Sequence, residues 1–253
     1  MRPSPVFFGL LAATAAGGAL AAFGDPASLL TSSKDPLLVG GIFLLVLAGW
    51  ATSLTLHEFG HAIVAFRGGD HEVAIKGYLT MDIRKYTDPV FSIVLPLLIL
   101  AIGGIPLPGG AVWINNWALR SRRVSTWVSL AGPLSNLGLG ILLTLAISLI
   151  PMPVGLAIGL SYLALLQILA FILNILPVPG LDGYGAIEPY LSPQARELGA
   201  KARPWAPLAL FAVLFVVTPV QNVFFEVSYG AFELIGGEQL LASFGASAFQ
   251  FWR

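Results

Sequence analysis

Five long apolar runs constrain this chain more than any other feature of its sequence. They cover residues 6–23, 38–65, 128–150, 154–176 and 206–223. An α-helix needs about 20 apolar residues to cross a bilayer. Only 10% of the residues are charged, whereas soluble domains carry about 25%. We therefore expect an all-α polytopic membrane protein with about five to six transmembrane helices.

Three segments leave alternatives open. The first run could be a secretory signal because it is rich in small residues, but only Arg2 precedes it as a basic residue, which favours a retained span. The tail, 224–253, carries three glutamates and could form an interfacial helix or a sixth span. A small β element could form near 70–88. With no internal repeat and no long polar linker, residues 1–253 are expected to form a single integral-membrane domain.

A further apolar run, 90–107, is interrupted by prolines and glycines. If it crossed the membrane, the basic cluster at 120–123 would face the opposite side from the basic residues of 67–85. Short basic loops tend to stay in the cytoplasm. We therefore predict a re-entrant hairpin near 90–112, with the N-terminus and both loops 66–127 and 177–205 on the cytoplasmic side.

Charge and cysteine content exclude several classes of function. The formal net charge is zero, so nothing points to a nucleic acid as a partner. The chain has no cysteine, which removes disulfide frameworks and thiolate metal sites. Any metal ligands must therefore be His, Asp or Glu. The lipid bilayer is the one partner that composition implies, and the oligomeric state stays open.

The second run ends in "LTLHEFGHAIVAF", residues 54–66, which places three titratable side chains in an apolar helix. His57 and His61 are four residues apart, so their imidazoles lie one turn apart on one helix face and can reach one ion. Glu58 lies beside the first ligand and could accept a proton from a water molecule that the ion activates. This is the HExxH pattern of zinc hydrolases. Two histidines that bridge helices would be the structural alternative, but ionisable groups in a span are usually functional.

A catalytic zinc site usually has three protein ligands and one open position. Asp182, in "NILPVPGLDGYG" (174–185), follows an apolar helix and a break at two prolines, on the side of the membrane expected for His57 and His61. It is the favoured third ligand, although Pro, Gly and Asp also favour a plain turn. Glu188 and Glu197 are alternative third ligands. His71 is expected to be a solvated loop residue.

The stretch "LAGPLSNLGLG" (130–140) places Gly132, Asn136 and Gly140 on one helix face. Small residues allow helices to approach closely in a membrane, so this face could serve packing, with Asn136 as a hydrogen-bonding brace. Alternatively, Asn136 could donate to a substrate carbonyl or oxyanion. Asn174 is a second candidate of this kind, for which a structural role is favoured.

These stretches together resemble the site-2 protease family of intramembrane zinc metalloproteases. The similar motifs are "HEFGH", "AGPLSN" and "NILPVPGLDG", in the family's order, and the resemblance covers about residues 40–190. It implies one Zn²⁺ held by His57, His61 and Asp182, with Glu58 as general base. It also implies a three-helix catalytic core within about 38–190 and makes Asn136 a better candidate for the active-site cleft. The chain has no room for the PDZ or CBS domains of many relatives.

The resemblance implies an endopeptidase that hydrolyses peptide bonds in or near the transmembrane segments of membrane proteins. The cell membrane of a bacterium or archaeon is the expected location, with an organellar membrane as alternative and the active site toward the cytoplasm. A membrane metal-ion carrier with the same His/Asp site is the main rival, although transporters often contain two related halves. An inactive relative that binds substrate helices is a further alternative.

Overall fold

The computed structural model describes residues 2–31, 33–86 and 112–252. The re-entrant hairpin predicted near 90–112 therefore lies outside the described residues, apart from Val112 at its end. The described residues form an all-α structure, as the composition predicted.

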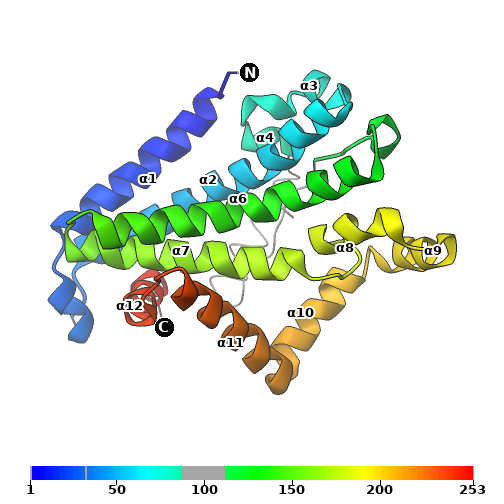
Figure 1. Cartoon of the computed structure of the whole chain (residues 1–253). Coiled ribbons are helices and arrows are strands. Elements are labelled where there is room, and N and C mark those ends of the chain that lie inside the picture. Colours follow the sequence, from blue (N-terminus) through cyan, green and yellow to red (C-terminus); the bar gives the residue numbers. More distant parts are fainter. Residues whose placement is uncertain (1, 32, 87–111, 253) are drawn as a thin grey trace.

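Among the described residues, four helices are long and apolar enough to cross a membrane: α1 (Pro5–Phe23), α2 (Pro36–Gly68), α6 (Arg122–Leu149) and α7 (Val154–Ile175). They correspond to the first four predicted spans and lie side by side in Figure 1, where α2, α6 and α7 form the centre of the molecule. The buried hydrophobic core lies mainly between α2 and α7. About 70% of the residues in the most apolar stretch of each helix are buried inside the protein. Together they confirm a polytopic membrane protein.

Polar residues mark where these helices begin. Ser4, Asp35 and Ser121 each accept a hydrogen bond from a backbone N–H in the first turn of α1, α2 and α6. Such N-caps satisfy donors that have no partner within the helix. α2 ends at Gly68, and Gly69 follows with a positive φ of 123°, a conformation that glycine adopts without a steric penalty. These signals set the length of α2 at 33 residues.

Glycines allow the long helices to approach one another closely. A Cβ added to Gly41 would overlap the backbone of Ala21, so α1 and α2 are in backbone contact there. A Cβ at Gly60, inside the HEFGH motif, would lie 2.9 Å from the carbonyl oxygen of Ala131 in α6. A Cβ at Gly140 would lie 2.8 Å from Cδ1 of Ile168 in α7. The Gly140 end of the small face predicted on 130–140 therefore packs against α7, as expected for membrane helices.

The β element predicted near 70–88 is wrong for the described residues, which run to 86. They form three short helical pieces, α3 (Glu72–Ile75), η2 (Tyr78–Thr80) and α4 (Ile83–Tyr86). Most of their backbone hydrogen bonds close locally, and the polar pattern is explained by side chains that cap turns, such as Asp70 and Asp82. The carbonyl of Thr80 accepts a hydrogen bond from the N–H of Ser4, which places the start of α1 beside this segment.

The fifth apolar run is broken. α10 (Ala206–Val216) and α11 (Thr218–Leu234) meet at an angle of 96°, so the span predicted over 206–223 is not one continuous helix. Pro219 explains the break, because a proline lacks a backbone donor and is tolerated only in the first turn of the second helix. Counting the bent pair as one span raises the number of candidate spans to five in the part of the chain that the structure describes. The tail continues as α11 and α12 (Gln239–Phe249), and α12 crosses beneath α7 in Figure 1.

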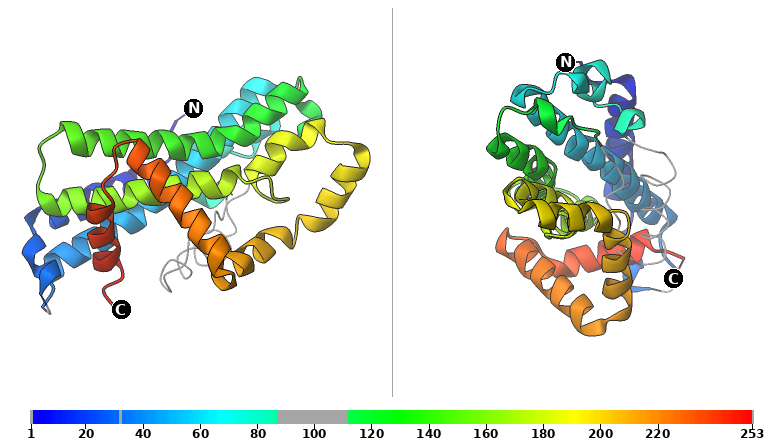
Figure 2. Two further views of the ribbon diagram at one scale, coloured as in Figure 1. Left: turned by 60° about the horizontal axis from the view of Figure 1, so that its bottom comes forward. Right: turned by 90° about the vertical axis from the view of Figure 1, so that its right-hand side faces the viewer.

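The two ends of the bundle differ. One end carries the loops 24–35 and 150–153. The other carries the start of α1, α3, α4, and four short elements: η4 (Asn116–Ala118), α8 (Asp182–Ile187), η5 (Glu188–Tyr190) and α9 (Pro193–Ala202). The left view of Figure 2 also shows these two sets of loops at opposite ends of the bundle. The grouping of loops predicted from charge is thus confirmed for the described loops, while the identity of the cytoplasmic face stays a prediction.

Candidate metal centre

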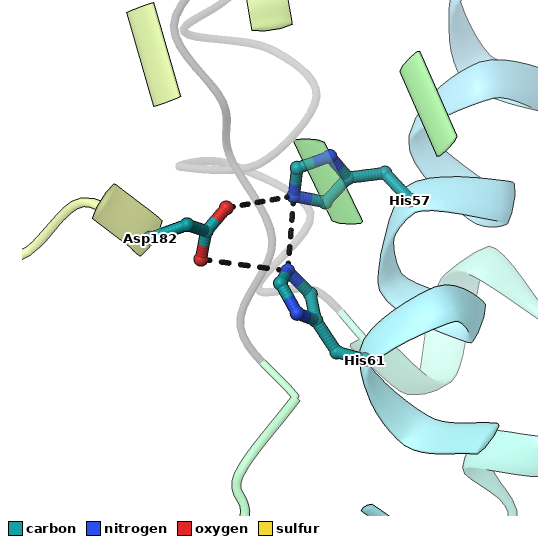
Figure 3. Close-up of side chains that lie close together, drawn as sticks. All are labelled: His57, His61 and Asp182. Atoms are coloured by element: carbon teal, nitrogen blue, oxygen red, sulfur yellow. Dashed lines mark hydrogen bonds and ion pairs between the residues drawn. The ribbon is translucent and has the colours of Figure 1, made fainter. Parts of the chain in front are cut away.

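Three side chains from two distant segments meet at the second end of the bundle. His57 and His61 project from one face of α2, and Asp182 is the first residue of α8 (Figure 3). Nε2 of His57 lies 3.2 Å from one carboxylate oxygen of Asp182, and Nε2 of His61 lies 3.4 Å from the other. The two Nε2 atoms are 3.1 Å apart. The candidate ligand atoms of these three side chains all lie within 4.8 Å of one another.

A tight turn brings Asp182 back toward α2. α7 ends at Ile175, and the chain reverses through two turn hydrogen bonds, from Val178 N–H to Leu176 O and from Leu181 N–H to Val178 O. Gly180 adopts φ 99° in this turn. A Cβ at Gly183 would overlap the carbonyl oxygen of Ile175, so the start of α8 lies directly against the end of α7. The break predicted at Pro177 and Pro179 is therefore confirmed.

Hydrogen bonds behind the imidazoles determine which ring nitrogens face the centre. Nδ1 of His61 lies 2.7 Å from the carbonyl oxygen of Val128 in α6. A carbonyl oxygen can only accept, so this Nδ1 carries a proton, and in the neutral ring Nε2 then keeps its lone pair. Nδ1 of His57 lies 2.5 Å from the side-chain oxygen of Asn136, also in α6. Second-sphere contacts of this kind orient metal-binding histidines.

The arrangement fits a zinc ion. Two imidazole nitrogens and a carboxylate converge on one point, and these are the nitrogen and oxygen ligands that zinc takes in proteins. Ligands at zinc distances of about 2.1 Å in a tetrahedron lie about 3.4 Å apart, close to the observed separations of 3.1, 3.2 and 3.4 Å.

A glycine leaves room beside the same point. A Cβ on Gly132 would overlap Nε2 of His61 and lie 2.6 Å from Nε2 of His57. The α6 backbone therefore passes directly against these two ring nitrogens, and only a residue without a side chain fits there. Gly132 was predicted from sequence to serve helix packing, and the structure gives it a place at the centre itself.

Glu58 lies beside the group without belonging to it. Its side chain is 2% exposed, and one carboxylate oxygen accepts a hydrogen bond of 3.1 Å from the N–H of Val112. Tyr86 is also buried, and its hydroxyl donates a hydrogen bond to the carbonyl oxygen of Tyr78. Burial, and secondarily the charge of Glu58, raises the pKa of the Tyr86 phenol, which therefore stays neutral. No hydrogen bond from the described residues reaches the second carboxylate oxygen of Glu58.

A cavity of about 480 Å³ adjoins His57, His61, Asp182 and Glu58. Asn174 lines it from the end of α7, and Glu188 and Arg203 line it from the polar side, where they form an ion pair at 2.9 Å. Asn136 does not line this cavity. Its oxygen faces His57, and its amide nitrogen donates to Gln167 at 2.8 Å. The two asparagines singled out in the sequence thus lie in different places, one at the cavity and one behind a ligand.

The alternative ligands lie elsewhere. Glu188 pairs with Arg203, and Glu197 is exposed and pairs with Lys201 at 2.7 Å. His71 is exposed and its ring contacts Phe66. None of the three belongs to the group of converging ligand atoms. Gln167, which sequence reasoning missed, could have been noticed as the one side-chain amide within the otherwise apolar "LALLQILAF" of α7.

The fold and the site together define a polytopic membrane protein with a His-His-Asp group suited to zinc. Comparison with known proteins agrees. Over 254 residues the chain is 47% identical to a Mycobacterium tuberculosis protein named "Putative zinc metalloprotease Rip2", covering 100% of this chain and 95% of the relative. The Mycolicibacterium smegmatis protein of the same name is 45% identical over 255 residues, with the same coverage.

A Bacillus subtilis protein named "Putative zinc metalloprotease YwhC" is 33% identical over 179 residues, which are 66% of this chain and 78% of the relative. No family model and no solved structure matches. The chain belongs to the zinc metalloprotease family of these bacterial relatives, the site-2 protease family, as its motifs indicated. Its cofactor is accordingly Zn²⁺.

Proposed function

We propose that the protein is an intramembrane endopeptidase that hydrolyses peptide bonds in or near the transmembrane segments of other membrane proteins. The observation that carries this proposal is the convergence of His57, His61 and Asp182 beside a buried Glu58 at the end of a spanning helix. In this assignment, the two histidines and Asp182 hold the ion and Glu58 is the general base.

The division of labour follows from the positions of the side chains. Zn²⁺, when bound, supplies a Lewis acid that polarises a carbonyl oxygen and lowers the pKa of water to about 7. Glu58 accepts the proton of the attacking water and passes it to the nitrogen of the departing amine. Asn174, which lines the cavity, donates from its amide to the carbonyl oxygen of the scissile bond. Asn136 acts behind His57 instead.

The depth of the site suits a substrate that leaves the bilayer only in part. His57 lies 21 residues after Pro36, the first residue of α2, which is about 32 Å along the helix. The hydrocarbon layer is about 30 Å thick. The ligands therefore lie near the boundary of that layer, where water can enter through the cavity lined by Glu188 and Arg203. We assign this boundary to the cytoplasmic face.

The test compares Glu58→Gln with Glu197→Gln, an exposed carboxylate on α9 that pairs with Lys201. The proteins are purified in detergent, reconstituted with a panel of tagged single-span membrane proteins, and the products are mapped by mass spectrometry. Glu58→Gln should keep its zinc but lose cleavage by at least about 100-fold, because an amide cannot accept the proton. Glu197→Gln should retain both.

Three outcomes would contradict the proposal. Normal turnover by Glu58→Gln would remove Glu58 as the base. Cuts that fall only in soluble regions remote from any span would contradict the intramembrane assignment. A metal carrier would be indicated if the protein took up metal into vesicles, if Glu58→Gln did not change this uptake, and if no cleavage was found.

A further inference from the structure

Gln167 is the most unusual buried residue outside the ligand group. It lies in the middle of α7 with an exposed fraction of 0%, surrounded by apolar residues of the same helix. Its side-chain oxygen accepts a hydrogen bond from Asn136, and its Nε2 has no hydrogen-bond partner within the described chain. Burying an amide with unpaired donors costs free energy. The presence of Gln167 at this buried position therefore needs an explanation.

The hydrogen-bond contacts form a continuous series across three helices. Nδ1 of His57 in α2 contacts the oxygen of Asn136 in α6, and the nitrogen of Asn136 donates to the oxygen of Gln167 in α7. All three side chains are at most 4% exposed, so water does not compete for these bonds. This series of contacts therefore connects His57 to the centre of the helix bundle.

A side-chain amide can rotate so that its oxygen and nitrogen exchange places. The two histidines therefore differ, because His57 contacts such an amide and His61 contacts a backbone carbonyl. The carbonyl of Val128 holds the His61 proton on Nδ1 in every case, since a backbone carbonyl cannot donate. Asn136 offers His57 an acceptor in one orientation and a donor in the other. In the second orientation the His57 proton moves to Nε2, the atom that faces Asp182, and the lone pair for a metal ion is lost.

We propose that Gln167 is a positioning residue that holds Asn136 in the orientation that keeps the His57 lone pair on the metal side. In the orientation that the structure gives Gln167, its oxygen accepts the N–H of Asn136, which leaves the oxygen of Asn136 for His57. This inference rests on the proposed role of His57 as a ligand and adds what decides the state of that ligand. Orienting contacts of this kind change metal affinity by about 10- to 100-fold.

The first experiment measures the zinc dissociation constant of the full chain in detergent by competition with a chromophoric chelator. Gln167→Met keeps the size of the side chain and removes the acceptor, and should weaken zinc binding by about 10-fold. Gln167→Glu retains acceptor oxygens only, and should bind zinc at least as tightly as the original chain. Leu166→Met, at the adjacent and equally buried position of α7, is the matched control and should leave the constant unchanged.

A second variant separates orientation from packing. Asn136→Asp presents a carboxylate, which accepts from His57 in either orientation and has no need of Gln167. Introduced into the Gln167→Met protein, it should restore most of the lost zinc affinity. A purely structural role of Gln167 would not be rescued by a change in another helix, so failure of this rescue overturns the inference.

Spectroscopy supplies a direct readout. The chain has three histidines, so ¹⁵N-histidine labelling gives few ring signals. Without metal, His57 should carry its proton on Nδ1 in the original chain and on both nitrogens in exchange in Gln167→Met. Unchanged tautomers and unchanged zinc affinity in Gln167→Met overturn the inference alone. An original chain that binds no zinc overturns the metal centre instead.

Discussion

Gly132 shows at the scale of one residue how the site depends on an absent side chain. Its Cα lies where a Cβ would overlap the nitrogen of His61 that faces the centre. The same helix contains Gly138, where an added Cβ meets nothing within 4 Å. The two glycines therefore offer a matched pair, since both substitutions add one methyl group to α6.

We expect Gly132→Ala to lose most of its zinc and to cleave at least about 100-fold more slowly, because a displacement of about 1 Å at reacting groups costs this much. Gly138→Ala should retain zinc and activity. Zinc content by mass spectrometry of purified protein, together with cleavage rates, checks both. Equal zinc content in the two variants would show that α6 can move away from the ligands without cost.

At the scale of elements, the contact between α1 and α2 depends on another glycine. A Cβ at Gly41 would overlap the backbone of Ala21, whereas a Cβ at the neighbouring Gly40 meets nothing within 4 Å. α1 is attached to the bundle mainly along this contact, since only 22% of its apolar window is buried. The rest of its surface is left to face lipid.

Gly41→Ala should therefore destabilise the protein by about 1–3 kcal/mol, the usual cost of overpacking. Gly40→Ala should be neutral or stabilising by up to about 1 kcal/mol, because alanine favours helix over glycine. Thermal unfolding in detergent measures both. If Gly41→Ala unfolded at the same temperature as Gly40→Ala, the close contact between α1 and α2 would not contribute to stability.

On the scale of the whole molecule, the alternation of loops between two ends leads to a test of orientation. Ser33 lies at the end opposite the metal centre, and Gln194, in α9, lies at the same end as the centre; both are exposed. The chain has no native cysteine, so each position can carry the only thiol in the protein.

With a membrane-impermeant maleimide, Ser33→Cys should be labelled on intact cells, and Gln194→Cys only after the membrane is permeabilised. This result follows if basic loops stay in the cytoplasm. The inverse pattern would place the centre on the outer side and contradict the assigned topology. Retained zinc in both variants serves as the control for folding.

Much of this protein was predictable because the signals are local. In a bilayer a spanning backbone must satisfy its hydrogen bonds within the helix, so apolar runs predicted α1, α2, α6 and α7 closely. The i, i+4 spacing of His57 and His61 likewise follows from the period of one helix. The proline break after an apolar helix and the expected side of the membrane favoured Asp182 as the third ligand, and the resemblance to known motifs strengthened that choice. The turns at 72–86 and the bend at Val217 escaped prediction because composition alone does not distinguish them from a strand or a span.

The sequence by itself determined the spanning helices, the residues able to bind zinc and the break that lets Asp182 turn back. Only the tertiary structure decided that Gly132 borders the ligands, that Asn136 lies behind His57, and that Gln167 stands behind Asn136. The reason is physical. A helix and its ligand spacing depend on neighbours along the chain, whereas the hydrogen that a ligand carries depends on atoms of other helices, whose approach is set by how the whole bundle packs.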